Sequence, residues 1–175
     1  MTRVTCVVRP MSAGDIPVFV AAFGAGDANK RPALFDRYLD ERDAGGLVAL
    51  TALLDGAAAG YVTLLWTSRY PPFARDGIPE IVDLNVVPDR RRHGVGDALV
   101  AACEDAARAA DRTTIGLGVG LYADYGSAQR LYIRRGYVPD GAGVLYDWGP
   151  VAPGSMLRLD DDAVLAMTKP LGGRQ

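Results

Sequence analysis

The sequence predicts a mixed α/β fold, in which antiparallel and parallel strands share one sheet. Two apolar runs of strand length, 47–54 and 60–67, flank the turn signal Asp55–Gly56, so the sheet is expected to begin with an antiparallel hairpin. From residue 80 onward, strand patterns alternate with helical patterns, which is typical of α/β sheets. We therefore expect about six or seven strands flanked by about four helices.

The first elements follow from periodicity and from residues that end a strand or helix. Residues 4–9 are rich in β-branched side chains and predict a short strand. Ser12 is a candidate cap for a helix that ends before Gly24. Pro32 suits the first turn of a second helix, whose apolar side chains recur at helical spacing until Gly45.

The remaining elements come after the hairpin. Residues 69–79 contain three prolines and a glycine and are expected to form a loop. A strand over 80–87 is stopped by Pro88, and a long alanine-rich helix follows the glycines at 94 and 96. The later segments predict further strands and one helix, namely strand 113–119, helix 127–135, strand 144–148 and strand 164–168.

Composition limits the class of protein. The 175 residues are 49% hydrophobic and 23% charged, with a net charge of −2, which fits one domain over 1–175. The longest uncharged stretches, such as 56–68, are far shorter than the roughly 18 apolar residues that span a bilayer, and no signal-peptide core follows Arg3. We expect a cytoplasmic protein without a membrane partner.

Metal and nucleic-acid binding are disfavoured as well. His93 is the single histidine, and Cys6 and Cys103 lie far apart without a CxxC motif, so no metal site is expected. A pI near 5.3 argues against a general nucleic-acid binder, which needs a broad basic surface.

The most informative segment has the form of an anion site. Three arginines and His93 at 90–93 follow the strand 80–87, and Gly94 and Gly96 then open a helix. Glycines allow a tight turn that exposes backbone N–H groups, and a helix N-terminus carries roughly half a positive charge. This arrangement suits a diphosphate.

Two familiar phosphate motifs fit this segment poorly. A Walker P-loop needs Lys and then Ser or Thr, where this chain has Asp97 and Ala98. A dinucleotide GxGxxG motif needs a small residue where Leu99 stands; Gly118, Gly120 and Ala123 form a GxGxxA that remains a weak alternative.

A third interpretation is a resemblance to a known family. Arg91, Gly94 and Gly96 match the pattern Arg or Gln, two residues, Gly, one residue, Gly or Ala, which is the first half of the acetyl-coenzyme A site in the GNAT superfamily of N-acetyltransferases. Residues 84–88 resemble that family's fourth strand and its exit, 128–137 its later helix and turn, and 9–16 its first strand and helix. The resemblance covers most of the chain and implies the GNAT fold.

The resemblance also implies a coenzyme site. Backbone N–H groups at Val86 and Val87 are expected to hold the acetyl carbonyl or the pantetheine arm. Where the family's later motif has Asn three residues before an alanine, this chain has Tyr125, which is expected either to replace the polar contact of that Asn or to help shape the acceptor pocket. The expected cofactor-binding residues are Val86, Val87, Arg91, Arg92, His93, Gly94, Val95, Gly96, Asp97, Tyr125 and Ala128.

Transfer to an amine needs a base. A lysine-like amine has a pKa of about 10.4, so it is protonated at neutral pH and has to lose a proton before it can attack. Glu80 is the first candidate, because its separation from Arg91 equals that of the glutamate base in the histone-acetyltransferase branch. Asp83 is the second candidate, since a bulge in the strand could change which side chain faces the substrate.

The departing thiolate is expected to take a proton from a tyrosine. Tyr132 matches the tyrosine that many members of the superfamily place beside the sulfur, with Tyr122 and Tyr125 as alternatives.

The sequence therefore predicts an acetyl-CoA-dependent N-acetyltransferase acting on a primary amine of a small molecule or peptide by direct attack in a ternary complex. The alternative is a non-catalytic acyl-CoA binding or regulatory module on the same fold. We expect no metal, nucleic-acid or membrane partner, and a monomer or homodimer. No loop has a charge pattern that identifies the acceptor.

Overall fold

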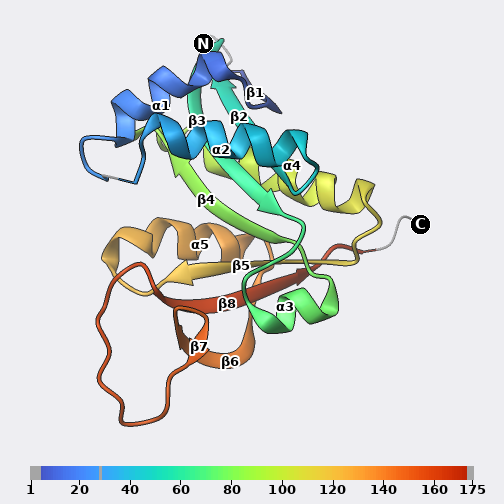
Figure 1. Ribbon diagram of the computed structural model, residues 1–175, viewed down its shortest axis with the longest axis vertical. Helices are drawn as coiled ribbons and strands as arrows, with labels where there is room; N and C mark the ends of the chain where they lie inside the picture. Colours follow the sequence, from blue (N-terminus) through green and yellow to red (C-terminus); the bar gives the residue numbers. More distant parts are fainter. Residues whose placement is uncertain (1–4, 28, 173–175) are drawn as a thin grey trace. The chain divides into compact units, whose positions relative to one another are not determined.

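The computed structural model describes residues 5–27 and 29–172, which form eight β-strands and five α-helices (Figure 1). The chain divides into two compact units. The first contains Met1–Trp66 and Ile81–Ala106, and the second contains Thr67–Glu80 and Ala107–Gln175.

In the first unit, four strands lie side by side in chain order: β1 (Cys6–Pro10), β2 (Leu47–Leu54), β3 (Ala57–Leu65) and β4 (Glu80–Val86). The hairpin β2–β3 closes through Asp55 and Gly56, both with positive φ (50° and 84°), as the right-handed twist of a two-residue turn requires. β4 runs antiparallel to β3, because the Thr63 hydroxyl donates to the Val82 carbonyl and the Val87 N–H donates to the Ala59 carbonyl.

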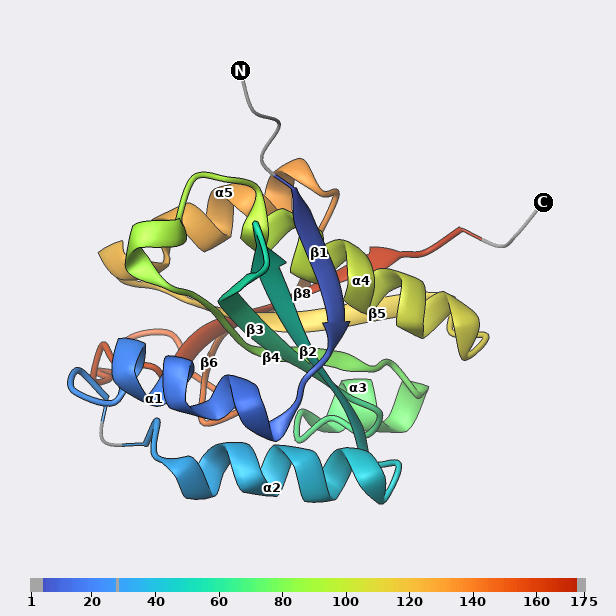
Figure 2. The same cartoon turned by 90° about the horizontal axis from the view of Figure 1, so that it is seen from above.

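Helices cover both faces of this sheet. α1 (Ile16–Phe23) and α2 (Pro32–Asp43) lie on one side, and α4 (Val95–Ala109) lies on the other (Figure 2). Adjacent residues of β3 show the alternation, since Tyr61 packs against Phe19 and Phe35, with ring centroids 4.9 and 5.2 Å away, while Gly60 faces Leu99 of α4.

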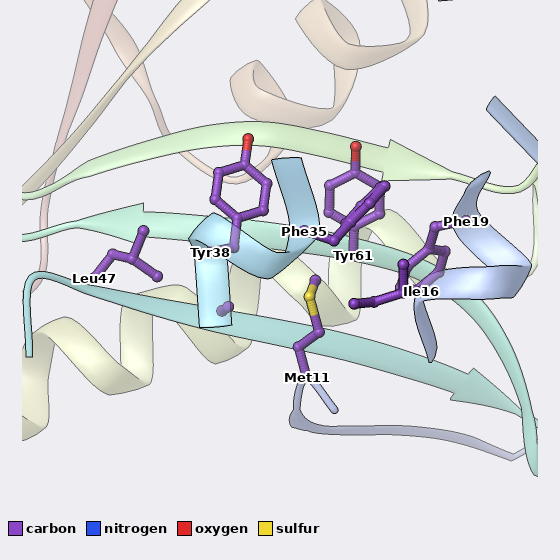
Figure 3. Close-up of a cluster of buried hydrophobic side chains, with 8 residues drawn as sticks. Met11, Ile16, Phe19, Phe35, Tyr38, Leu47 and Tyr61 are labelled. Atoms are coloured by element: carbon purple, nitrogen blue, oxygen red, sulfur yellow. The ribbon is translucent and has the colours of Figure 1, made fainter. Parts of the chain in front are cut away.

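The core between β2, β3 and the first two helices is aromatic (Figure 3). Its buried members are Met11, Ile16, Phe19, Phe35, Tyr38, Leu47, Ala49 and Tyr61. Figure 3 shows the hydroxyls of Tyr38 and Tyr61 both pointing toward β4. This core therefore carries two polar groups at the edge nearest that strand.

In the second unit the strands lie in the order β5 (Thr114–Gly120), β8 (Ala163–Pro170), β6 (Val138–Tyr146) and β7 (Gly149–Pro150), and each neighbouring pair is antiparallel. α5 (Gly126–Arg134) follows β5, and the Gln129 amide donates to the Gly120 carbonyl at 2.8 Å. α3 (Pro71–Asp76) precedes β4.

The structure differs from the expected elements in three places. Residues 71–76 form α3 rather than a loop, because Pro71 and Pro72 occupy the first helical turn, where a missing N–H costs nothing. β6 begins at Val138 instead of residue 144, since a register shift between Pro139 and Val144 accommodates a stretch that breaks the strand pattern. The hairpin strand expected at 60–67 lies at Ala57–Leu65. Val4, the expected start of the first strand, lies outside the described residues.

Candidate functional site

The turn between β4 and α4 has an open backbone. Arg92 and Gly94 have positive φ (64° and 78°), and α4 begins at the next residue, Val95. An added Cβ at Gly94 would meet no atom within 4 Å, so an anion can approach the main chain there. The first N–H groups of a helix have no intrahelical acceptor, which makes this turn suited to a diphosphate.

The sequence-predicted basic side chains surround this turn. Arg91, Arg92 and His93 are exposed. The Arg91 Nε donates to the Val86 carbonyl at 3.3 Å, and His93 Nδ1 lies 2.7 Å from the Arg91 carbonyl oxygen. Positive charge is therefore available without a buried partner that would have to be displaced.

The start of α4 packs closely against β3. Val95 is buried, and a Cβ on Gly60 would come within 3.1 Å of its side chain. Gly96 is half-buried and Asp97 is exposed in the first turn. The close approach at Gly60 fixes the helix start against β3.

The two backbone donors expected at the end of β4 differ. The Val87 N–H donates to the Ala59 carbonyl at 2.9 Å and is therefore engaged in the sheet. Because successive N–H groups of a strand alternate in direction, the Val86 N–H points away from β3. Val86 is thus the donor better placed to meet a ligand.

Asp83 accepts hydrogen bonds from four side chains. Tyr38 and Tyr61 donate to Oδ2 at 2.8 and 3.0 Å, Asn85 donates to Oδ1 at 2.8 Å, and the Lys30 ammonium pairs with the same carboxylate. Asp83 also has a φ of 54° within β4, which is uncommon for a residue with a side chain. With this backbone conformation, the Asp83 carboxylate faces these four donors.

Glu80 has a different environment. Its side chain is buried (1% exposed), and the Ser68 hydroxyl donates to Oε2 at 2.6 Å. Among the residues that the structure describes, Oε1 has no hydrogen-bond partner. Burial raises the pKa of Glu80, although hydrogen bonds from Ser68 and the Arg69 backbone act in the opposite direction. A carboxylate with a free lone pair and a raised pKa is chemically suited to accept a proton.

Ser68 also connects Glu80 to the following segment. The Tyr70 N–H donates to the Ser68 oxygen at 2.9 Å, so that oxygen accepts one hydrogen bond and donates another. The orientation of Oε2 is fixed by these hydrogen bonds, whereas Oε1 is buried and has no hydrogen-bond partner among the described residues.

The residues expected on α5 and before it lie in the second unit. Tyr132 is buried and its ring lies 5.9 Å from that of Tyr137 in an edge-to-face arrangement, while Ala128 is half-buried. The Tyr125 ring covers Gly120, and its hydroxyl donates to Asp161 at 2.8 Å. Tyr122 donates to the same carboxylate, which with burial raises the pKa of Tyr122 to about 12.

Residues 5–27 and 29–172 contain no cluster of three or more side chains that could hold a metal ion. Over that same part of the chain, no helix combines the length and apolar character needed to span a membrane.

A comparison with protein families decides the class. The model of the acetyltransferase (GNAT) family matches residues 18–137, which is more than half of the chain. The chain belongs to the GNAT acetyltransferase family. Acetyl transfer is therefore its reaction class, with an acyl-CoA and an acceptor as substrates.

Solved structures show the same fold as this GNAT chain. Ribosomal-protein-alanine N-acetyltransferase from Brucella melitensis is 20% identical, with a TM-score of 0.69 over 94% of this chain and 99% of that chain. yncA from Salmonella typhimurium, solved with its cofactor acetyl-CoA, is 17% identical (TM-score 0.69, 98% and 96% covered). PaiA N-acetyltransferase from Thermoplasma acidophilum, in complex with coenzyme A, is 12% identical (TM-score 0.67, 95% and 99% covered).

These similarities confirm the predicted mixed α/β fold of GNAT type, with slightly more strands than expected. No curated protein matches the chain by sequence. At this level of identity the solved structures define the fold, and the acceptor has to be inferred from the residues of this GNAT chain.

Sequence reasoning missed the partners of both carboxylates. Lys30, Tyr38 and Tyr61 lie between 22 and 53 positions from Asp83, and Ser68 lies 12 positions before Glu80. Tyr38 and Tyr61 have one signal in the sequence: each is a polar-tipped ring on a strongly apolar face, where a buried hydroxyl needs an acceptor. Ser68 lies in a loop and has no comparable signal.

Proposed function

We propose that this chain transfers the acetyl group of acetyl-CoA to a primary amine of a small molecule or peptide, by direct attack in a ternary complex. The observation that carries the proposal is Glu80: a buried carboxylate with one oxygen held by Ser68 and the other without a hydrogen-bond partner among the described residues. A binding module has no need for such a group, whereas transfer to an amine requires a base.

We assign coenzyme binding to the backbone and side-chain groups that the turn between β4 and α4 exposes. The N–H groups at the start of α4, from Val95 to Asp97, would donate hydrogen bonds to the diphosphate, with Arg91, Arg92 and His93 supplying charge around it. Gly94 and Gly96 keep the backbone accessible, and Val86 offers its N–H to the acetyl carbonyl. Val87 lines the end of β4, and Tyr125 and Ala128 are assigned to the pantetheine arm.

The chemistry assigned to this chain's residues is proton transfer. Glu80 Oε1 takes the proton from the amine, directly or through a water molecule, and the neutral nitrogen attacks the thioester carbon. The C–N bond forms and the C–S bond breaks. Tyr132 gives its hydroxyl proton to the departing sulfur, which needs only modest help because thiols titrate near about 8.5.

Asp83 is assigned a supporting role. Its carboxylate already accepts hydrogen bonds from two tyrosines and Asn85 and pairs with Lys30, so a proton from a substrate would have to displace one of them. This contrast favours Glu80 as the base.

The first prediction concerns Glu80→Gln. We expect turnover near neutral pH to fall by about two orders of magnitude with unchanged affinity for acetyl-CoA, as for loss of a general base. Because burial raises the pKa of Glu80, the activity of the parent should fall as the pH drops through a value above that of an ordinary glutamate, and this limb should vanish in the variant. Thiol release against pH measures both effects.

Asp83→Asn tests the competing assignment. If it removes turnover in a folded protein while Glu80→Gln retains normal turnover, the base is Asp83 and not Glu80.

The second prediction concerns Tyr132→Phe. Loss of the proton donor should lower turnover by about tenfold, less than loss of the base, and the effect should shrink with thioesters of more acidic thiols. Tyr137→Phe is the matched control, because that ring is also buried and lies 5.9 Å away. Equal rates for Tyr132→Phe and the parent, where chemistry limits turnover, would leave Tyr132 a packing residue.

A non-catalytic acyl-CoA binding module is the second candidate. Its support is Tyr125, which stands where the family's motif has Asn and whose hydroxyl is directed to Asp161. Binding of acetyl-CoA without acceptor-dependent thiol release across a broad panel of amines would favour it.

A further inference from the structure

Exposed apolar side chains gather at two places in the second unit. Met156, Leu157 and Leu159 lie in the connection between β7 and β8, and they are 101%, 39% and 59% exposed. Ile133, near the end of α5, is 64% exposed, and Val138, the first residue of β6, is 56% exposed. A chain that works as a monomer rarely exposes large apolar patches. Both places are therefore candidates for a contact surface.

The connection 151–162, which we call the strap, is held in place near both of its ends (Figure 1). The Val151 N–H donates to the Val144 carbonyl at 3.2 Å, and the Tyr146 hydroxyl donates to Asp160 at 3.1 Å. A groove of about 470 Å³ lies beside the strap and is lined by apolar and polar side chains of the same segment. The strap therefore presents its apolar side chains next to a hollow that a partner can enter.

The two places carry opposite charge. The strap contains three aspartates and one arginine, whereas residues 126–139, which include α5, contain three arginines and no acidic residue. Tyrosine hydroxyls donate to Asp160 and to Asp161, while Asp162 is exposed and takes no part in those bonds. Arg134 is also exposed, at the end of α5. Each place thus combines apolar side chains with an exposed charge, negative on the strap and positive on α5.

The two places lie at opposite ends of the strand pair β6–β8. Val138 pairs with Thr168 at one end, and Tyr146 pairs with Ala163, the residue after the strap, at the other. Between these ends residues 138–143 are exposed, and β7 covers only the last two residues of β6. A two-fold axis perpendicular to β6 therefore brings the strap of one copy to the α5 end of another, twice and in the same way. A symmetric dimer requires this reciprocity.

We propose that this side of the second unit binds a second copy of the chain, in a two-fold dimer in which each strap packs on Ile133 and Val138 of the other protomer. Burial of the apolar side chains supplies the affinity. Asp162 opposite Arg134 of the other protomer selects the pairing, since exposed ion pairs add little affinity. Two straps facing each other would bring together two negative segments, so the charges favour strap against α5. The inference does not depend on acetyl transfer.

The first test measures the mass of the chain in solution. By sedimentation at micromolar concentration the parent should be a dimer, with twice the 18.6 kDa of one chain. Leu159→Lys should be a folded monomer, because it places a charge in the apolar contact. Val18→Lys is the matched control and should remain dimeric, since Val18 is an exposed apolar residue of α1 in the first unit. A monomeric parent, or equal dimerisation of the two variants, overturns the proposal.

The second test exchanges the charges across the contact. Arg134→Asp and Asp162→Arg each place like charges together at both symmetric contacts, so each should weaken the dimer by at least about a hundredfold. A mixture of the two variants has opposite charges at both contacts and should form a heterodimer within about tenfold of the parent affinity, which native mass spectrometry identifies by its mass. Either variant dimerising like the parent, or no heterodimer in the mixture, overturns the contact of strap with α5.

Discussion

Glu80 and Asp83 show how the environment of a residue separates two similar side chains on one strand. Asp83 has its charge balanced by Lys30 and its oxygens engaged by neighbouring hydroxyl and amide groups. Glu80 is buried, its pKa is raised, and one of its oxygens has no hydrogen-bond partner in the part of the chain that the structure describes. The sequence places both on the strand, but their partners come from segments far away along the chain. For this reason sequence reasoning could identify both carboxylates and could not rank them on their contacts.

The third prediction follows from the contacts of Asp83. Asp83→Asn should lower the free energy of unfolding by about 2–3 kcal/mol, because it leaves the Lys30 ammonium, whose side chain is 13% exposed, without a counter-charge. Lys30→Met in the Asp83→Asn background should recover part of this loss. Urea unfolding of the two single variants and the double variant measures the coupling. Additive effects of the two substitutions would mean that the ion pair contributes little.

At the scale of elements, the sequence is most informative where local chemistry decides the structure. The hairpin turn at Asp55–Gly56 and the glycine turn before α4 need positive φ, and the residues there supply it. α3 was missed because a short helix that begins with two prolines has the composition of a turn. The strand predicted at 144–148 starts later than β6 because Gly141 and Gly143, both with positive φ, interrupt the strand pattern, whereas Val138 and Pro139 before them pair with β8.

The fourth prediction concerns the turn before α4. Gly94→Asp should weaken acetyl-CoA binding by at least about tenfold, because it adds a carboxylate where the helix start is assigned to a diphosphate. Gly45→Asp is the matched control: Gly45 has a nearly equal φ (79° against 78°), and a Cβ there also meets no atom within 4 Å. Both variants place a side chain at a positive φ. Calorimetry showing equal affinity in the two folded variants would remove the diphosphate assignment.

At the scale of the whole molecule, the match to the GNAT family model spans residues 18–137 and draws on residues of both units. The resemblance to GNAT proteins identified the family and the fold, because its motifs recur in order along the chain. The acceptor could not be predicted in the same way, since it depends on side chains from several loops that only the folded chain brings together.

The fifth prediction concerns stability in the presence of ligand. At a hundred times its dissociation constant, acetyl-CoA should stabilise the folded chain by about 2.7 kcal/mol, which corresponds to a rise in Tm of roughly 5–10 °C for a chain of this length. Calorimetric scans over a range of ligand concentrations measure the shift. Gly45→Asp should show the full shift and Gly94→Asp little of it. A Tm independent of acetyl-CoA in the parent would contradict coenzyme binding.

The glycines of β5 also have a consequence for the order in which the chain folds. β2 and β3 are joined by two residues and can pair within microseconds, whereas Thr114 of β5 finds its partner only at Pro170. Until β8 is available, the edge of β5 that pairs with β8 is exposed and is a template for aggregation. Alternating glycines lower its tendency to extend and pair wrongly. β5 therefore forms its native pairs late in folding, when Phe73, Trp148 and Tyr125 supply the packing that its glycines lack.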